Sequence, residues 1–207
     1  MSDFNLKAKG WDTDPVKIDR ARAVARGIRA ILPRQPGQSA LEYGCGTGLL
    51  SFALQPFPGF ITLADSSAGM HQVLADKIKA AGVGNMLPLR LDLTTDAVPA
   101  RRFSLLYTLM TLHHIIDTEK ILGQFHELLY PGGILCVADL DREDGTFHGP
   151  GFKGHPGFDR HELAEKTMAA GFAPPAFSTV FNLTRETGKV KKHYPLFLMT
   201  TVRPPSH

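Results

Sequence analysis

Apolar residues along the chain follow two patterns: short continuous runs, and longer stretches in which they recur every three or four positions. The runs are typical of buried strands, and the spaced pattern is typical of helices packed on one face. Five strands are predicted, at 39–43, 60–64, 86–91, 103–109 and 134–138. Five helices are predicted, at 15–32, 47–54, 70–81, 121–128 and 159–170. Because strands and helices alternate, we expect a mainly parallel sheet covered by helices on both faces.

The last part of the chain departs from this alternation. Two β-rich segments, 176–183 and 195–202, are joined by a short polar stretch and should pair antiparallel. Segment 141–157 is rich in Gly and His and lacks periodicity, so we expect a substrate-side loop there. Segment 94–102 is short and holds Pro99, so the helix expected between two parallel strands should be missing. One face of the sheet would then be less covered.

Composition narrows the class of protein. The 207 residues, 43% of them hydrophobic, fit one domain over 1–207. Lys and Arg number 23 against 20 for Asp and Glu, a balance that gives little support to a nucleic-acid partner. The two cysteines, Cys45 and Cys136, lie in apolar or Gly-rich runs, which favours a reducing compartment. Because no apolar run approaches the roughly 20 residues of a membrane span and no signal-peptide pattern opens the chain, we expect a cytoplasmic protein.

Segment 41–48 is the most informative stretch. It combines an apolar lead-in, an acid and three glycines, Gly44, Gly46 and Gly48. Glycine allows a backbone to approach a ligand closely, and a turn between a strand and a helix offers free N–H groups. The dinucleotide fingerprint needs glycine at position 49, where Leu49 stands, so a nicotinamide cofactor is disfavoured. The turn predicts another nucleotide-like ligand.

Acidic residues stand near the carboxyl ends of four predicted strands, where ligands bind in open parallel sheets. They are Glu42, Asp65, Asp92 and Asp139. Asp65 follows the glycines by about 20 residues. This position suits either a carboxylate that binds the two ribose hydroxyls of a nucleotide or a residue that caps the next helix. Asp92 with Leu93 suits an adenine ring or an ordinary turn. Glu42 suits an ammonium group on the ligand or a half-buried acid bonded to backbone.

Six segments stand in an order that matches one family. They are 8–12 with Phe4, 41–48, 63–70, 92–93, 103–114 and 129–133. Together they resemble the motifs of class I S-adenosylmethionine-dependent methyltransferases of the small-molecule, ubiquinone/menaquinone-biosynthesis type. The resemblance implies a Rossmann-like, doubly wound α/β sheet of seven strands, mainly parallel with an antiparallel last strand. Ser104 departs from the family pattern, in which a mostly structural acid follows the Phe at this point.

The resemblance also implies the cofactor, S-adenosylmethionine, and its product, S-adenosylhomocysteine. Residues 1–34 would form an N-terminal lid and helix, in which Trp11 caps the cofactor, stacks on a substrate or anchors the core. Cofactor contacts are assigned to Trp11, Glu42, Gly44, Cys45, Gly46, Asp65, Ser66, Met70, Asp92, Leu93 and Leu109.

The implied reaction asks the protein mainly to align a nucleophile with the S–CH₃ bond of the cofactor. A base is needed only for an acceptor that arrives protonated. The catalytic candidates are His113, Asp139 and His148. His113 follows the fourth strand, beside the expected position of the methyl group. The alternative for His113 and His114 is packing and hydrogen bonding at the start of a helix.

The segment after the fifth strand is acidic. Its carboxylates belong to Asp139, Asp141, Glu143 and Asp144. They predict either a solvated loop or a site for a cationic substrate or divalent ion. His148 and His155 add ligand-type atoms, but the spacing is not the tight spacing of a metal site, so no bound metal is expected.

The leading interpretation is a methyltransferase for a small-molecule acceptor, a monomer or homodimer with no membrane partner. A nucleic-acid methyltransferase is the second interpretation. However, segment 108–111 lacks the Asn/Asp-Pro-Pro-aromatic motif of base amino-group methylation, and neither cysteine follows a proline. A non-catalytic S-adenosylmethionine-binding protein is the third, because function lies in the site and not in the fold. The acceptor atom stays open.

Overall fold

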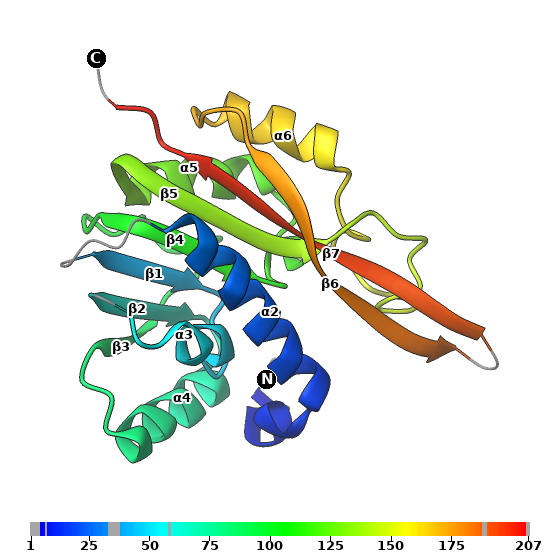
Figure 1. The fold of residues 1–207 in the computed structure, drawn as a ribbon, viewed down its shortest axis with the longest axis horizontal. Helices are drawn as coiled ribbons and strands as arrows, with labels where there is room; N and C mark the ends of the chain where they lie inside the picture. Colours follow the sequence, from blue (N-terminus) through cyan, green and yellow to red (C-terminus); the bar gives the residue numbers. More distant parts are fainter. Residues whose placement is uncertain (1–4, 7, 33–37, 58, 188–189, 206–207) are drawn as a thin grey trace.

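Seven strands of the described residues form one sheet in the order β3-β2-β1-β4-β5-β7-β6 (Figure 1). The structure is a computed structural model that describes residues 5–6, 8–32, 38–57, 59–187 and 190–205. Phe4, which belongs to the first of the family-like segments, lies outside the described residues. The strands are β1 Ser39–Tyr43, β2 Phe60–Asp65, β3 Met86–Arg90, β4 Phe103–Leu109, β5 Leu129–Leu140, β6 Ala176–Thr187 and β7 Val190–Val202. Strands β1 to β5 pair parallel, and β7 pairs antiparallel with both β5 and β6. The predicted fold class is confirmed.

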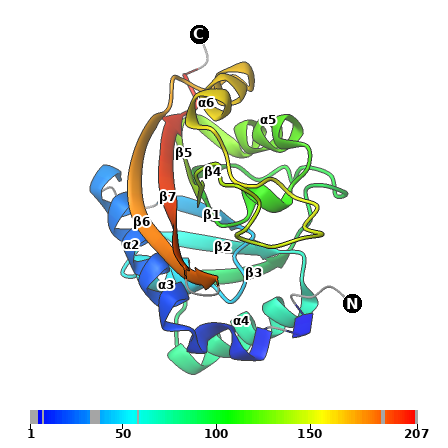
Figure 2. The ribbon, with the colours of Figure 1, turned by 90° about the vertical axis from the view of Figure 1, so that its right-hand side faces the viewer.

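Helices cover both faces of the sheet (Figure 2). They are α2 Pro15–Ile31, α3 Leu49–Leu54, α4 Ala68–Ala81, α5 Thr118–Leu128 and α6 Arg160–Ala169, with 3-10 helices η1 Ala8–Thr13 and η2 Leu112–His114. Apolar side chains of α2, α3 and α4 pack on one face, and those of α5 and α6 pack on the other. Each face therefore has its own buried core, as the spaced apolar pattern predicts.

Local sequence signals set the ends of the helices. The Asp14 carboxylate accepts a hydrogen bond from the Val16 N–H (2.9 Å) at the start of α2, and Gly82 ends α4 with φ 63°. Asp159 caps α6 by accepting from two backbone N–H groups, while the Glu162 carboxylate pairs with Arg142. Helix α3 begins two residues later than predicted because Gly48, with φ 77°, occupies its N-cap.

Three strand predictions were too short. Strand β5 was predicted at 134–138 but begins at Leu129 and continues through 131–133, with an irregular register opposite β4. Strands β6 and β7 extend through the polar stretch that was expected to connect them. Cross-strand pairs such as Glu186 opposite Lys191 (3.6 Å) explain this extension, since opposite charges stabilise neighbouring strands without an apolar pattern.

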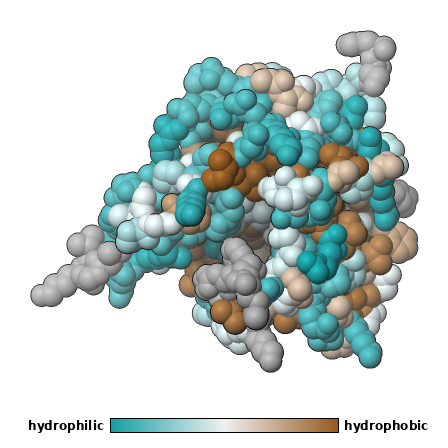
Figure 3. Space-filling view, turned by 180° about the vertical axis from the view of Figure 1, so that it is seen from behind, coloured by the Kyte–Doolittle hydropathy of each residue, from teal (hydrophilic) through white to brown (hydrophobic). Residues whose placement is uncertain are grey.

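The predicted absence of a helix between β3 and β4 is confirmed, because 94–102 forms only turns and bends. A cavity of about 240 Å³ opens on the sheet face shared with α5. Its lining is mostly apolar and consists of Leu41, Thr62, Leu87, Leu89, Leu91, Pro99, Arg101, Phe103 and Leu128. Apolar patches are visible from this side in Figure 3.

Within the described residues, none of the helices combines the length and apolar character needed to cross a membrane.

Candidate cofactor and acceptor site

The glycine turn connects β1 to α3 and holds three glycines with positive φ. Gly44 has φ 69°, and a Cβ built there would lie 2.2 Å from Thr111 Cγ2, so the turn packs directly on the segment after β4. At Gly46 the space is open: a built Cβ would lie 3.8 Å from Trp11 Nε1 and 3.9 Å from Met70 Sδ. These two side chains therefore border the open side of the turn, where the cofactor is expected.

Asp65, at the end of β2, ties the turn to the start of α4. Its Oδ2 accepts from the Gly46 N–H (2.8 Å), and its Oδ1 accepts from the Ser67 N–H (2.8 Å). Burial raises the pKa of Asp65, while these two hydrogen bonds oppose the rise. The helix cap itself is Ser67, whose hydroxyl accepts from the Met70 N–H (3.2 Å). A carboxylate offers about four lone-pair positions, so Asp65 retains capacity for two further donors.

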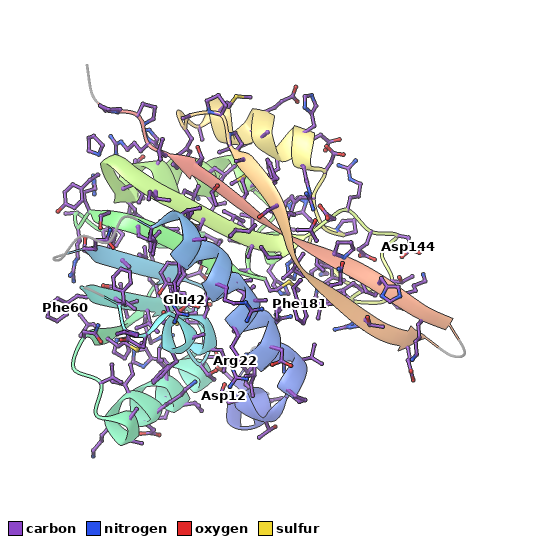
Figure 4. All side chains as sticks on the ribbon, in the orientation of Figure 1. Asp12, Arg22, Glu42, Phe60, Asp144 and Phe181 are labelled. Carbon is purple, nitrogen blue, oxygen red and sulfur yellow. The ribbon has the colours of Figure 1, made fainter. Side chains whose placement is uncertain are left out.

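The N-terminal segment lies over the turn and the start of α4. Asn5 Oδ1 accepts from the Ser67 hydroxyl (2.6 Å) and from the Gly69 N–H (2.9 Å). Asp12 accepts from the Thr47 hydroxyl and from Lys77 Nζ (2.7 Å), which anchors η1 to α4 (Figure 4). The segment lies where a lid over the turn is expected, and Trp11 is half-buried there. The lid itself and the role of Trp11 stay predictions.

Asp92 and Leu93 follow β3. Asp92 Oδ1 accepts from the Thr94 N–H (3.0 Å), which is the ordinary-turn role, and Asp92 acts electrostatically on Asp65 and raises its pKa. The Leu93 side chain is fully buried, and its N–H donates to the Tyr43 hydroxyl (3.0 Å). Burial, together with nearby carboxylates, raises the pKa of Tyr43 to about 12. Contact of Asp92 and Leu93 with adenine stays a prediction.

Glu42 belongs to a buried network beneath the turn (Figure 4). Its Oε2 accepts from the Ser51 N–H (3.1 Å) and from the Ser51 hydroxyl, which lies 2.5 Å from the Tyr107 hydroxyl. Burial raises the pKa of Glu42 to about 8 despite these hydrogen bonds. Cys45 is also buried, which raises its thiol pKa, so its approach to a ligand is through its backbone.

A buried histidine–aspartate pair lies after β4 and near the end of β5, where the acceptor is expected. His113 Nδ1 lies 2.6 Å from Asp139 Oδ1, and the His113 N–H donates to Asp139 Oδ2 (3.2 Å). The side chains are 1% and 0% exposed. Burial alone would raise the pKa of Asp139, but the imidazole and three hydrogen bonds outweigh it and lower that pKa. His113 Nε2 is buried and has no hydrogen-bond partner among the described residues.

The loop over 141–157 brings His148 onto this pair. The ring centroids of His113 and His148 lie 4.9 Å apart, and those of His148 and Phe152 lie 3.8 Å apart in a stacked arrangement. The His155 N–H donates to the His113 carbonyl (2.7 Å), which fastens the far end of the loop. The three catalytic candidates therefore lie together in space.

The acidic residues of this loop are committed to pairing. Asp141 accepts two hydrogen bonds from Arg160 (2.7 Å each), Asp144 accepts from Lys192 Nζ (2.7 Å; Figure 4), and Glu143 accepts from the Phe147 N–H (3.0 Å). These contacts fasten the loop to α6 and to the β6–β7 hairpin. These partners occupy the carboxylates of Asp141, Glu143 and Asp144, which speaks against a cation site on them. Asp144 and the two residues after it are exposed, as the solvated-loop alternative expects.

Three features of the site were missed by sequence reasoning. Met110 has φ 55°, a left-handed conformation that is uncommon for a residue with a side chain, and it directs the chain from β4 toward His113. Asn5 docks on α4. Arg20 of α2 has a buried Nε without a partner among the described residues; burial lowers its pKa to about 10, and the charge of Asp139 opposes this. No short-range signal marks any of them.

Comparison with known proteins now identifies the family. A family model described as a methyltransferase domain matches residues 16–186. The chain belongs to this methyltransferase-domain family. The resemblance to class I S-adenosylmethionine-dependent methyltransferases drawn from the motifs is thereby confirmed, with S-adenosylmethionine as the family's cofactor.

Curated relatives of this methyltransferase domain carry different names, among them methyltransferases of trans-aconitate and of ubiquinone biosynthesis. An uncharacterized methyltransferase of Schizosaccharomyces pombe is 32% identical over 157 residues, 72% of this chain and 53% of the relative. The trans-aconitate 2-methyltransferase of Deinococcus radiodurans is 32% identical over 132 residues, 63% of this chain and 48% of the relative. The chain spans about half the length of the curated relatives it matches.

A solved structure of similar fold comes from a Haloferax volcanii complex with the Trm112 methyltransferase activator. One of its chains superposes on this methyltransferase domain with a TM-score of 0.77 at 16% identity, covering 99% of both chains. At that identity the likeness shows the fold alone.

Proposed function

We propose that the protein transfers the methyl group of S-adenosylmethionine to a small-molecule acceptor. The observation that supports this best is the placement of the glycine turn, Asp65 and the His113–Asp139 pair at one edge of the sheet. Relatives named for trans-aconitate and for ubiquinone biosynthesis support a small acceptor. Both cysteines are free thiols, in keeping with the predicted cytoplasmic location. The oligomeric state, a monomer or a homodimer, stays a prediction.

The residues at the turn suit the cofactor. The free capacity of the Asp65 carboxylate fits the ribose hydroxyls, and the open space at Gly46, bordered by Trp11 and Met70, fits a group that must approach the backbone closely. Ser66, Asp92, Leu93 and Leu109 complete the proposed contacts at the ends of β2, β3 and β4, and Glu42 and Cys45 support the turn from below. Bound S-adenosylmethionine supplies an electrophilic methyl group on a sulfonium.

The histidines suit the acceptor. Asp139 fixes the ring of His113 through Nδ1, so that Nε2 is the nitrogen that faces the acceptor. We assign His113 and His148 to contact with the acceptor and Asp139 to positioning His113. Holding the nucleophile in line with the methyl group contributes up to about 7–11 kcal/mol to lowering the barrier in favourable cases.

The test is transfer of a labelled methyl group from S-adenosylmethionine to a panel of O, N, S and C acceptors, which includes small carboxylic acids and quinols. We expect label in at least one small molecule and a large loss with His113→Ala. Label in RNA or DNA instead would favour the nucleic-acid alternative. Cofactor binding without turnover over the whole panel would favour a non-catalytic binding protein.

A further inference from the structure

Three histidines from two distant segments meet at the acceptor side of the site. His113 and His114 belong to η2, and His148 belongs to the loop about 35 positions later. One ligand-type atom from each lies within 4.8 Å of the others. The ring centroids are 4.2 Å apart for His113 and His114, and 5.4 Å apart for His114 and His148.

We infer that His113, His114 and His148 bind a divalent metal ion of the zinc class at the acceptor side of the site. Three imidazoles with one open position are the ligand set of catalytic zinc sites. Zinc–nitrogen bonds of about 2.0–2.1 Å bring tetrahedral ligand atoms roughly 3.3 Å apart. The exposed rings of His114 and His148 would therefore turn inward on binding, while the buried His113 stays fixed.

The surroundings of His113 support this inference independently of the cluster. Metal-bound histidines donate their second ring N–H to a carboxylate or carbonyl, which fixes the ring and increases the basicity of the ligand nitrogen. Asp139 occupies this position, 2.6 Å from His113 Nδ1, and is itself held by the Leu140 N–H (2.8 Å). The remaining nitrogen, Nε2, is buried without a partner among the described residues, a cost that a metal bond would remove.

The role of the ion rests on the proposed function, whereas the site itself does not. An ion here would hold the acceptor through an oxygen or sulfur at its fourth position, so His113 would reach the acceptor through the metal. This arrangement suits acceptors with hydroxyl, carboxylate or thiol groups, whose oxygen or sulfur can bind the ion.

The experiment uses the full chain after removal of the affinity tag and of bound metal, the latter with a chelator. Binding of Co²⁺ is followed by the visible absorbance of the ion, and binding of Zn²⁺ is followed by its competition with Co²⁺. We expect one ion per chain with a tetrahedral Co²⁺ spectrum. His114→Ala or His148→Ala should weaken Zn²⁺ binding on the order of 100-fold, and Asp139→Asn should weaken it about 10–100-fold. Since His114 and His148 are exposed, these two variants should keep the fold, which circular dichroism checks.

The matched control is His161→Ala, an exposed histidine on α6 next to Glu165. It should bind Zn²⁺ as tightly as the unchanged protein. No binding with 1:1 stoichiometry, or equal binding by the His148→Ala variant, would overturn the inference. Calorimetry with S-adenosylmethionine on the same metal-free samples separates the two proposals, because failure to bind the cofactor counts against the function and not against the metal site.

Discussion

Asp65 connects the glycine turn to the start of α4. Its two oxygens hold the Gly46 and Ser67 N–H groups, and its remaining hydrogen-bonding capacity is assigned to the ribose. Asp65→Ala should weaken binding of both S-adenosylmethionine and S-adenosylhomocysteine by roughly 10–100-fold, because hydrogen bonds to a charged group contribute about 1.5–3 kcal/mol.

Isothermal titration calorimetry measures the effect of Asp65→Ala. Asp76→Ala, which removes an exposed carboxylate from α4, is the matched control and should leave both affinities unchanged. Equal affinity of the Asp65→Ala variant and the unchanged protein would refute the role of Asp65.

Glu42 makes stability depend on pH. Its pKa is about 8 in the folded protein and close to 4.5 in the unfolded chain, so between these values the folded state binds more protons. The free energy of unfolding should therefore fall as pH rises from about 5 to 9. Glu42→Gln, which stays neutral, should remove this decline and be the more stable form at pH 9.

Urea denaturation at a series of pH values tests the Glu42 prediction. Asp76→Asn on the exposed side of α4 serves as control and should retain the decline. The same pH slope in the Glu42→Gln variant and in the unchanged protein would show that Glu42 is not the group responsible.

Spacing was enough to predict where some candidate residues lie and not others. The positions of Asp65 and Asp92 near strand ends were predicted because the apolar runs before them are clear in the sequence. Their contacts with the cofactor stay predictions. The three-histidine cluster was not predicted, since a loop without periodicity brings His148 to His113 across about 35 positions. The contact of Asn5 with α4 was missed for a similar reason, because more than 60 positions separate the two segments along the chain.

The glycine turn is the element on which the site depends. Gly44 has φ 69° and no room for a Cβ, whereas Gly82 has φ 63° and nothing within 4 Å of a built Cβ. Gly82→Ala should thus cost only the backbone strain, about 1–2 kcal/mol, and leave cofactor affinity unchanged. Gly44→Ala should cost more and should weaken cofactor binding at least tenfold, because it displaces the turn or Thr111.

Thermal denaturation and calorimetry on both glycine variants test this pair. Equal losses of stability and affinity in the two would contradict the packing of Gly44 against Thr111. Because Gly44 and Gly82 have the same backbone conformation, the difference in stability and in cofactor affinity between the two variants isolates the contact of Gly44 with Thr111.

Most elements could be predicted from apolar periodicity, because each core-facing helix and parallel strand buries a continuous apolar face. The extension of β6 and β7 could not. It depends on cross-strand charge pairs and on the ties of Asp144 to Lys192 and of Arg185 to the Phe147 carbonyl, which only the assembled fold brings together. The length of β6 and β7 matters for the site, because the extended hairpin anchors the loop that carries His148.

For the whole molecule, cofactor binding should raise thermal stability by mass action. At a free ligand concentration of about 100 times Kd the gain is roughly 2.7 kcal/mol, or about 5–10 °C in Tm for a chain of this size. Differential scanning fluorimetry with S-adenosylhomocysteine measures the shift. The Asp65→Ala variant should show a much smaller shift at the same concentration, and an equal shift would place the ligand elsewhere.

The whole sheet positions the two halves of the site, with the turn after β1 and the histidine pair after β4 and β5. Calorimetric titration of the unchanged protein with S-adenosylmethionine and with S-adenosylhomocysteine tests the proposed cofactor site most directly. We expect one site per chain for each ligand, with affinity in the micromolar range. Absence of binding of both ligands at millimolar concentration would contradict the proposed site.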